Sequence, residues 1–208
     1  PGAPAFDYPS PESDAEARAQ DLDYFRHFLD LDKSYTPATR AQAASLIYEL
    51  ESDLADLEDG VFQLRIARAV AAADNGHTNI WLGGFSREHG RIPVRLYWFS
   101  DGLYVVSARP DHADLLGARV LAIGGYDFEE SGSRLRQFVG GTFEAFRAYR
   151  GPILFELPVA QFAAGLIVEV DETAMSVLPG SGEPVFRILP AQELGPDSPL
   201  YWPLQYLF

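Results

Sequence analysis

The 208-residue sequence contains no cysteine, which excludes disulfide bonds, thiolate metal ligands and a cysteine nucleophile. Positive charge is also scarce, because 16 lysines and arginines face 30 aspartates and glutamates and the net charge is −14. Nucleic acids and anionic membrane surfaces attract lysine and arginine, so this balance argues against both as partners. No apolar run approaches the roughly 18 residues of a membrane span. These absences favour a globular protein whose partners are not polyanions.

Motifs for metals, phosphates and a complete catalytic triad are missing as well. The four histidines are spread along the chain without a His-Glu-x-x-His motif, and His27, His89 and His112 are expected to be solvated or partly packed. The pairs Gly83-Gly84 and Gly124-Gly125 lack the flanking residues of phosphate-binding loops, so they predict breaks or turns. No serine lies in a Gly-x-Ser-x-Gly elbow. The sequence therefore predicts no metal and no cofactor.

The first third of the chain predicts three helices. Ser13 and Glu16 have the capping-box spacing, and apolar residues at helical spacing predict a first helix over 14–31. Thr36-Pro37 is an N-cap followed by proline at the first helical position, which begins a second helix. Asp59-Gly60 opens a third, alanine-rich helix. Short amphipathic helices joined by short loops are typical of a small bundle.

The third helix leads directly to a histidine. Asn75-Gly76 is a helix stop, because either residue accepts the left-handed conformation that closes a last turn. His77 follows at once, and an extended apolar segment is expected between it and Gly83-Gly84. A histidine held between a helix end and a strand is rigidly mounted, and its proton moves near neutral pH. His77 is a candidate general base, and the alternative is a helix-end histidine that only bonds backbone groups.

After residue 82 the pattern becomes mainly β. Segments 92–99 and 103–108 flank Asp101-Gly102, and Asp-Gly between two β-rich runs predicts a hairpin. Further along, the pattern predicts strands over 118–123, 166–170 and 185–189 and helices over 128–139, 142–149 and 158–164. The expected fold class is α+β, with a three-helix bundle followed by a β-rich domain that carries helical insertions.

Three segments in this order resemble the N-terminal half of the tail-specific, or C-terminal-processing, serine peptidases, particularly their tricorn-like branch. They are Asp74-Asn75-Gly76-His77-Thr78, Ile92-Pro93-Val94 through Asp101-Gly102-Leu103-Tyr104-Val105, and Leu116 through Gly125. The first is similar to the family's Asp-Gly-His-Thr segment with Asn75 inserted. The third resembles the strand and turn of a PDZ-like domain. The resemblance covers about residues 14–189 and implies a PDZ-like fold for the β-rich part.

The resemblance implies a serine peptidase whose nucleophile lies outside this chain. In tricorn-like members, the histidine at the position of His77 is the general base to a serine in a later α/β domain. That serine stands in a Ser-Ala-x-Glu setting, which this sequence lacks. In the Ser/Lys branch a lysine is the base and the histidine position is structural. The implied substrates are peptides or unfolded proteins, no cofactor is needed, and this chain alone is expected to be inactive.

The PDZ-like part also has a binding interpretation. Such domains take up an extended peptide C-terminus as an added strand at a sheet edge. Leu103, Tyr104, Val105 and Val106, with the helix that begins near Phe128, are expected to flank this groove. The chain would then be a non-catalytic peptide-binding module. In the competing interpretation, the domain only packs on the bundle and on the absent catalytic domain.

The expected organisation has three parts. A helical bundle spans 1–82, the PDZ-like domain spans 83–190, and the start of a missing C-terminal catalytic domain spans 191–208. The last part is proline-rich and ends in a very apolar segment, whereas natural C-termini are usually polar. Pro1-Gly2-Ala3-Pro4-Ala5 is typical of a processed N-terminus. An exported protein, periplasmic or extracellular, is therefore expected, with a catalytic domain that packs on this part.

Overall fold

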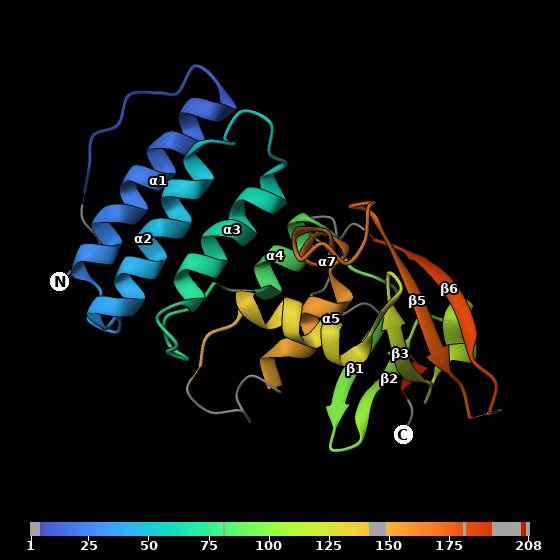
Figure 1. Ribbon diagram of the computed structural model, residues 1–208. Coiled ribbons are helices and arrows are strands. Elements are labelled where there is room, and N and C mark those ends of the chain that lie inside the picture. Colours follow the sequence, from blue (N-terminus) through green and yellow to red (C-terminus); the bar gives the residue numbers. More distant parts are fainter. Residues whose placement is uncertain (1–4, 81, 142–148, 181, 193–204, 207–208) are drawn as a thin grey trace.

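The computed structural model describes residues 5–80, 82–141, 149–180, 182–192 and 205–206. Three long helices lie side by side at one end, and an antiparallel sheet lies at the other (Figure 1). The fold combines helices with an antiparallel sheet, which confirms the predicted α+β class. The PDZ-like character of the β-rich part stays a prediction. Among the described residues, no helix is long and apolar enough to span a membrane.

The long helices begin where their capping signals predict. They are α1 (Asp14–Leu31), α2 (Pro37–Glu51) and α3 (Asp59–Ala71). Ser13 Oγ accepts a hydrogen bond from Glu16 N (3.2 Å), and Thr36 Oγ1 accepts one from Thr39 N (3.2 Å). The apolar stripes of these helices form a hydrophobic cluster of their own, which includes Leu22, Phe25, Leu29, Ala43, Ile47, Leu50, Phe62, Ala69 and Val70.

The sheet runs in the order β1-β2-β3-β5-β6, and each pair in it is antiparallel. The predicted hairpin consists of β1 (Val94–Phe99) and β2 (Gly102–Ala108). The sheet continues through β3 (Arg119–Ile123), β5 (Glu172–Leu178) and β6 (Val185–Pro190). Two short strands lie off this path, with β4 (Tyr126–Asp127) beside β3 and β7 (Gln205–Tyr206) beside β2.

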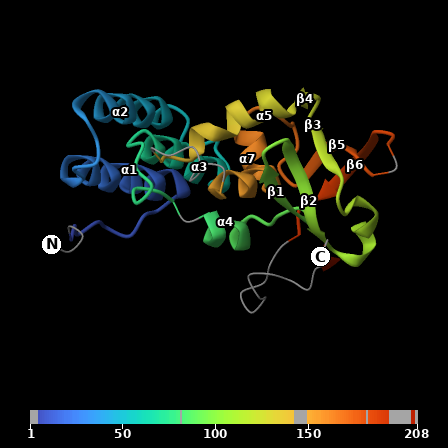
Figure 2. The ribbon, with the colours of Figure 1, turned by 90° about the horizontal axis from the view of Figure 1, so that it is seen from below.

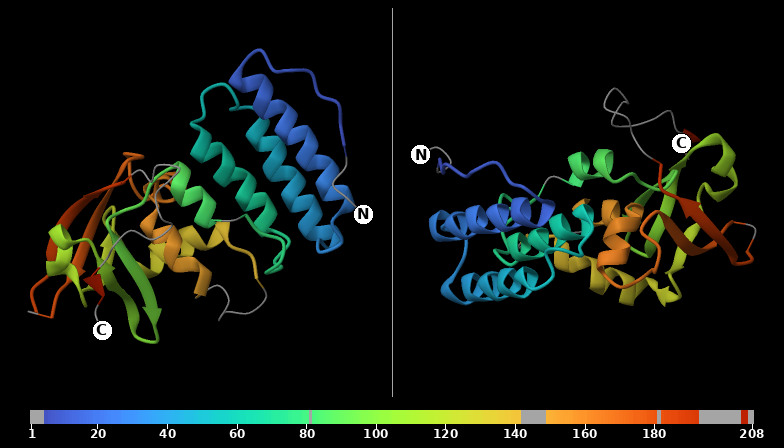
Figure 3. Two further views of the ribbon diagram at one scale, coloured as in Figure 1. Left: turned by 180° about the vertical axis from the view of Figure 1, so that it is seen from behind. Right: turned by 90° about the horizontal axis from the view of Figure 1, so that it is seen from above.

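Short helices follow the long ones, and apart from the first of them, which precedes β1, they lie between strands along the chain. They are α4 (Leu82–Glu88), η1 (Pro110–Leu115), α5 (Phe128–Leu135), η2 (Arg136–Phe138), η3 (Gly151–Glu156) and α7 (Pro158–Ala163). Of these, α5 and α7 lie between the long helices and the sheet (Figures 2 and 3). A second hydrophobic cluster joins Leu64 of α3 to Leu135, Val159 and the inner face of the sheet. Helix α3 therefore contributes to both cores.

Residues 78–80 after His77 form a bend and an irregular segment, and α4 begins at Leu82, so the predicted strand and the predicted break at Gly83-Gly84 are both wrong. Both glycines lie inside α4, where Ser86 Oγ donates to Gly83 O (2.9 Å). Leu82 and Phe85 are three residues apart on one helical face, and both are buried. Their burial outweighs the low helix propensity of the two glycines.

The predicted strand over 166–170 is wrong as well, because the chain there leaves α7 as an irregular turn. Gly165 has φ of 68°, and Leu166 N donates to Gln161 O (2.9 Å), so Leu166 is buried while Val168 is 85% exposed. The strand is β5 instead, where alternate residues face the core. The predicted helix over 128–139 is divided into α5 and η2. Residues 142–148 of another predicted helix lie outside the described residues.

Replacing Gly124 by alanine should destabilise the fold more than replacing Gly125. Both have positive φ (58° and 88°), a conformation that costs a residue with a Cβ about 1–2 kcal/mol. At Gly124 the added Cβ would also lie 1.6 Å from Leu166 O, whereas at Gly125 it meets nothing within 4 Å. We expect Gly124→Ala to lose about 3 kcal/mol of unfolding free energy and Gly125→Ala about 1 kcal/mol, measured by urea denaturation. Equal losses in the two variants would contradict the close approach of the Gly124 backbone to Leu166 O.

Candidate functional site

His77 lies in a loop that follows α3. The helix ends at Ala71, earlier than predicted, and the left-handed residue is Asp74 (φ 49°) rather than Asn75 or Gly76. Aspartate tolerates this conformation, because its short polar side chain bonds locally or to nearby backbone. Here Asp74 Oδ1 accepts a hydrogen bond from Gly141 N (3.1 Å). The start of the loop is thereby tied to the segment that follows η2.

The backbone around His77 is held by side-chain amides while the His77 side chain is exposed. His77 N donates to Asn75 Oδ1 (2.8 Å), and Asn79 Nδ2 donates to Gly76 O (2.7 Å). Arg150 Nη2 in turn donates to Asn79 Oδ1 (3.1 Å). In the described part of the chain, no hydrogen bond joins the His77 ring to a serine hydroxyl. The geometry is that of an accessible imidazole on an anchored loop.

Thr78 anchors the other side of the loop to the turn between α1 and α2. Its Oγ1 donates to Asp32 Oδ2 (3.1 Å) and lies 3.0 Å from Ser34 Oγ. Ser34 N donates to Asp32 Oδ1 (2.8 Å), and Arg40 Nη2 donates to Asp32 O (2.7 Å). Desolvation raises the pKa of Asp32, but the hydrogen bonds from Ser34 and Thr78 and the charge of Arg40 outweigh it and hold that pKa below its usual value. Asp32 is therefore a carboxylate at neutral pH.

Asp32→Asn should weaken the fold at neutral pH and not at acidic pH. Because folding lowers the Asp32 pKa from 3.8, its carboxylate stabilises the folded state above that pH and loses this contribution as pH falls through the folded pKa. We expect a loss of about 1 kcal/mol at pH 7 that shrinks progressively as pH falls below 3.8, the unperturbed pKa. Thermal unfolding between pH 3 and 7 measures it, with exposed Asp30→Asn on the same helix as the control. A difference that is constant with pH would contradict this role.

The His77 loop borders an open, largely apolar depression of about 450 Å³. Its lining comes from α1, from α3 and from the residues around His77. The lining residues are Tyr24, Phe25, Phe28, Asp32, Ile66, Val70, His77, Thr78, Asn79 and Ile80. A carboxylate, an imidazole and several apolar side chains thus meet in one hollow. No local sequence pattern indicated this hollow, because α1 and α3 meet only in the folded chain.

The four predicted peptide-binding residues lie elsewhere, on β2. Leu103 and Val105 are buried in the core, while Tyr104 and Val106 are half-buried. β2 pairs with β1 along one side and with β3 and β7 along the other. None of the four lines the depression beside His77, as far as the described residues show. The fold therefore does not bring them together with His77.

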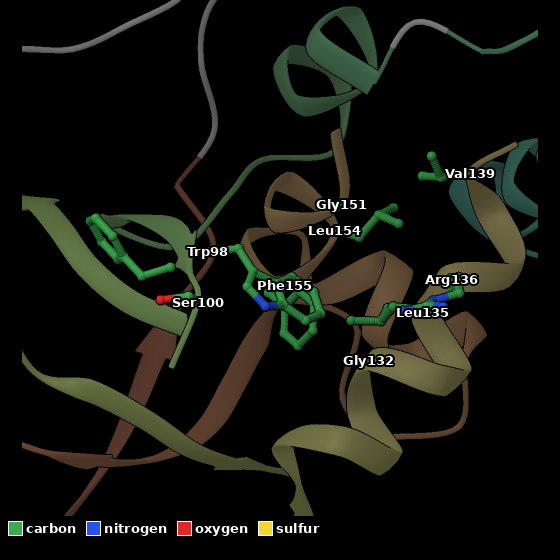
Figure 4. A pocket seen from close by; sticks show the side chains of 10 residues that line it. Trp98, Ser100, Gly132, Leu135, Arg136, Val139, Gly151, Leu154 and Phe155 are labelled. Atoms are coloured by element: carbon green, nitrogen blue, oxygen red, sulfur yellow. The ribbon is translucent and has the colours of Figure 1, made fainter. Parts of the chain in front are cut away.

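A cavity that the sequence analysis missed lies between the end of β1 and α5 (Figure 4). Its volume is about 280 Å³, and its apolar lining includes Trp98, Leu135, Val139, Leu154 and Phe155. The ring of Trp98 packs edge-on against Phe155, with centroids 6.0 Å apart. The signal that could have located it is the alternation in β1, which places Trp98 on the same face as buried Leu96.

A buried ion pair lies along the outer edge of β1 and was also missed. Glu156 is 1% exposed and forms an ion pair with Arg91, and its Oε2 lies 3.5 Å from Arg95 Nε. Leu96 N donates to Glu156 Oε1 (2.7 Å), and Ile92 N donates to Glu156 O (2.9 Å). Glu156 therefore joins η3 to β1, which is a structural role.

The other histidines of the described residues are not arranged to bind a metal ion. His89 is packed rather than solvated, since its ring lies 4.3 Å from the Phe85 ring and burial lowers its pKa. His27 bonds Asp23 O within its own helix (2.9 Å). No group of three or more histidine, aspartate or glutamate side chains that could hold a metal ion occurs within the described ranges.

No protein-family model and no curated protein sequence matches this chain. Among solved structures, the fold of this chain is similar to that of CPAF. The structure of mature CPAF complexed with lactacystin has a TM-score of 0.53 at 15% identity over 92% of this chain, and a crystal structure of mature CPAF has a TM-score of 0.50 at 13% identity over 85%. The chain spans 36% and 34% of those CPAF chains. CPAF is a chlamydial tail-specific-protease-like serine protease. At 13–15% identity, the likeness shows that this chain shares part of the fold of that protein.

Proposed function

We propose that this chain is the N-terminal part of a serine peptidase and that His77 is its general base. The observation that carries the proposal is an exposed imidazole on a loop anchored at Asp74, Thr78 and Asn79, in a chain whose fold follows part of CPAF. A general base must lie within hydrogen-bond distance of the nucleophile, in an orientation held by its surroundings. The anchored loop fixes the backbone of His77 and leaves its ring accessible. The approaching serine domain would then supply the nucleophile and the acidic partner that orients the ring.

In this mechanism a ring nitrogen of His77 takes the proton from a serine hydroxyl while the serine oxygen attacks the peptide carbonyl carbon. His77 then gives the proton to the leaving nitrogen as the C–N bond breaks. The serine and an acidic partner belong to a C-terminal domain that packs on this part. Assignment to the tricorn-like branch and export from the cytoplasm are further parts of the proposal. In a Ser/Lys mechanism His77 would be structural instead.

Peptide binding without hydrolysis is the second candidate function, and the cavity between β1 and α5 favours it. Enclosed apolar pockets with a few polar groups are the usual form of ligand sites. The cavity in Figure 4 has aromatic and aliphatic walls, with Ser100 and Arg136 also in its lining. A peptide side chain would enter this cavity, beside β1 rather than along Leu103–Val106.

The coding sequence that follows codon 208 tests the proposal. We expect it to encode a further domain with a serine in a Ser-Ala-x-Glu setting, which would supply the partner of His77. A stop codon at that point would overturn the peptidase proposal and leave peptide binding as the function.

A further inference from the structure

We infer that the depression beside His77 holds the residue that follows the scissile bond of a peptide substrate, and that it selects a large apolar side chain there. The inference rests on the proposed function, because it takes His77 as the base. It adds a substrate preference that the proposed function does not contain.

The side of the substrate follows from the path of the proton. In acyl transfer the base receives the proton of the serine hydroxyl as the C–O bond forms, and it returns that proton to the departing nitrogen as the C–N bond breaks. The ring of His77 must therefore come within about 3 Å of that nitrogen. The residue that carries this nitrogen then lies against the surface that adjoins His77. The depression between α1 and α3 forms part of this surface.

The walls of the depression favour an apolar side chain. Phe28, Ile66 and Ile80 are partly exposed, and all three pack against the buried cluster of the long helices. Phe25 and Val70, which are buried members of that cluster, complete the apolar lining. Covering partly exposed apolar groups is favourable, and the volume of about 450 Å³ lies within the range of ligand pockets.

Asp32 supplies the negative charge of the depression. Its carboxylate belongs to the lining and is held by Ser34 N and Thr78 Oγ1. A fixed carboxylate disfavours an acidic side chain and attracts the ammonium group of a newly formed N-terminus. The fragment that fits best thus begins with a large apolar residue and departs with a cationic amine.

Amino-acid amides with a free α-amino group imitate the departing fragment, so they test the inference on this chain without hydrolysis. We expect leucinamide and phenylalaninamide to shift the NMR signals of the Ile66 and Ile80 methyl groups saturably. Their binding should be about tenfold or more tighter than that of alaninamide, with glutamic acid α-amide weaker still. Equal binding of all four amides, or no shift at either isoleucine, would overturn the inference.

Ile66→Gln and Leu46→Gln form a matched pair of variants. Both residues are partly buried and pack on the same hydrophobic cluster, but only Ile66 lines the depression. We expect Ile66→Gln to weaken leucinamide binding about tenfold and Leu46→Gln to leave it unchanged. Ile66→Val, a milder change, should weaken binding a few-fold, which keeps the test usable if Ile66→Gln does not fold. Wild-type affinity in a folded Ile66 variant would contradict the inference.

The two proposals fail in different measurements. His77→Ala leaves the apolar walls in place, so this variant should still bind leucinamide more tightly than alaninamide. Wild-type hydrolysis by the complete protein with His77→Ala would overturn the proposed base. Loss of the preference among the amides would overturn the substrate inference alone.

Discussion

His77→Ala should reduce peptide-bond hydrolysis by the complete protein about 10²–10⁴-fold in kcat, because a positioned general base contributes a factor of that size. The fold should be unaffected, since the His77 side chain is exposed and its loop is held by the neighbours Asp74, Thr78 and Asn79. Steady-state kinetics on an unstructured protein substrate, with thermal unfolding of the same samples, measures both effects.

His27→Ala is the control for the loss of a histidine. His27 is a partly exposed residue of α1 that bonds Asp23 O, and it does not line the depression beside His77. Turnover should match that of the wild type in this variant. His77→Gln, which keeps hydrogen-bonding capacity but cannot carry the proton, should be as inactive as His77→Ala. Turnover near the wild-type value in both His77 variants would contradict the proposal that His77 is the general base and would favour a Ser/Lys mechanism.

Glu156→Ala should lower the free energy of unfolding by about 3–5 kcal/mol, because removal of one partner leaves a buried charge without compensation. The Arg91 side chain is 2% exposed and would lose its carboxylate partner, whereas the Arg95 side chain is 29% exposed and reaches water. The peptide N–H of Leu96 would also lose its acceptor. Urea denaturation measures the loss, and Glu183→Ala, an exposed residue before β6, is the control with an expected change near zero.

A double variant separates charge from packing at this position. Replacing the pair by Arg91→Met with Glu156→Leu removes both buried charges and keeps apolar volume, and such replacements are often neutral or stabilising. We expect it to recover most of the stability lost in Glu156→Ala. A double variant as unstable as Glu156→Ala would show that the hydrogen bond to Leu96 N, rather than the buried charge, is the main contribution.

Local signals were sufficient to predict most of the fold. Ser13 and Thr36 cap α1 and α2 as expected, and the Asp101-Gly102 turn joins the predicted hairpin. Each of these signals acts between residues close in sequence. The predictions fail where tertiary packing decides, as in α4, where buried Leu82 and Phe85 override two glycines. A short apolar run such as 166–170 does not by itself determine its secondary structure, because tertiary packing decides there as well.

The candidate site could be predicted only in part. His77 was singled out because it follows a helix end, which is a local feature. Its anchors are not local, because Thr78 bonds Asp32 across 46 residues, Asp74 bonds Gly141 across 67, and Asn79 bonds Arg150 across 71. The apolar depression has no signal in the sequence, and the cavity beside α5 has only the alternation in β1, since each is lined by elements from distant parts of the chain.

These distant anchors have a consequence for the order of events during synthesis. A chain that leaves the ribosome N-terminus first carries His77 long before it carries Gly141 and Arg150. The helices α1, α2 and α3 can pack early, but Asp74 can accept its bond from Gly141, and Asn79 its bond from Arg150, only after those residues have emerged. A nascent chain shorter than this contains His77 but not the two distant bonds that hold its loop, so the proposed base is positioned late.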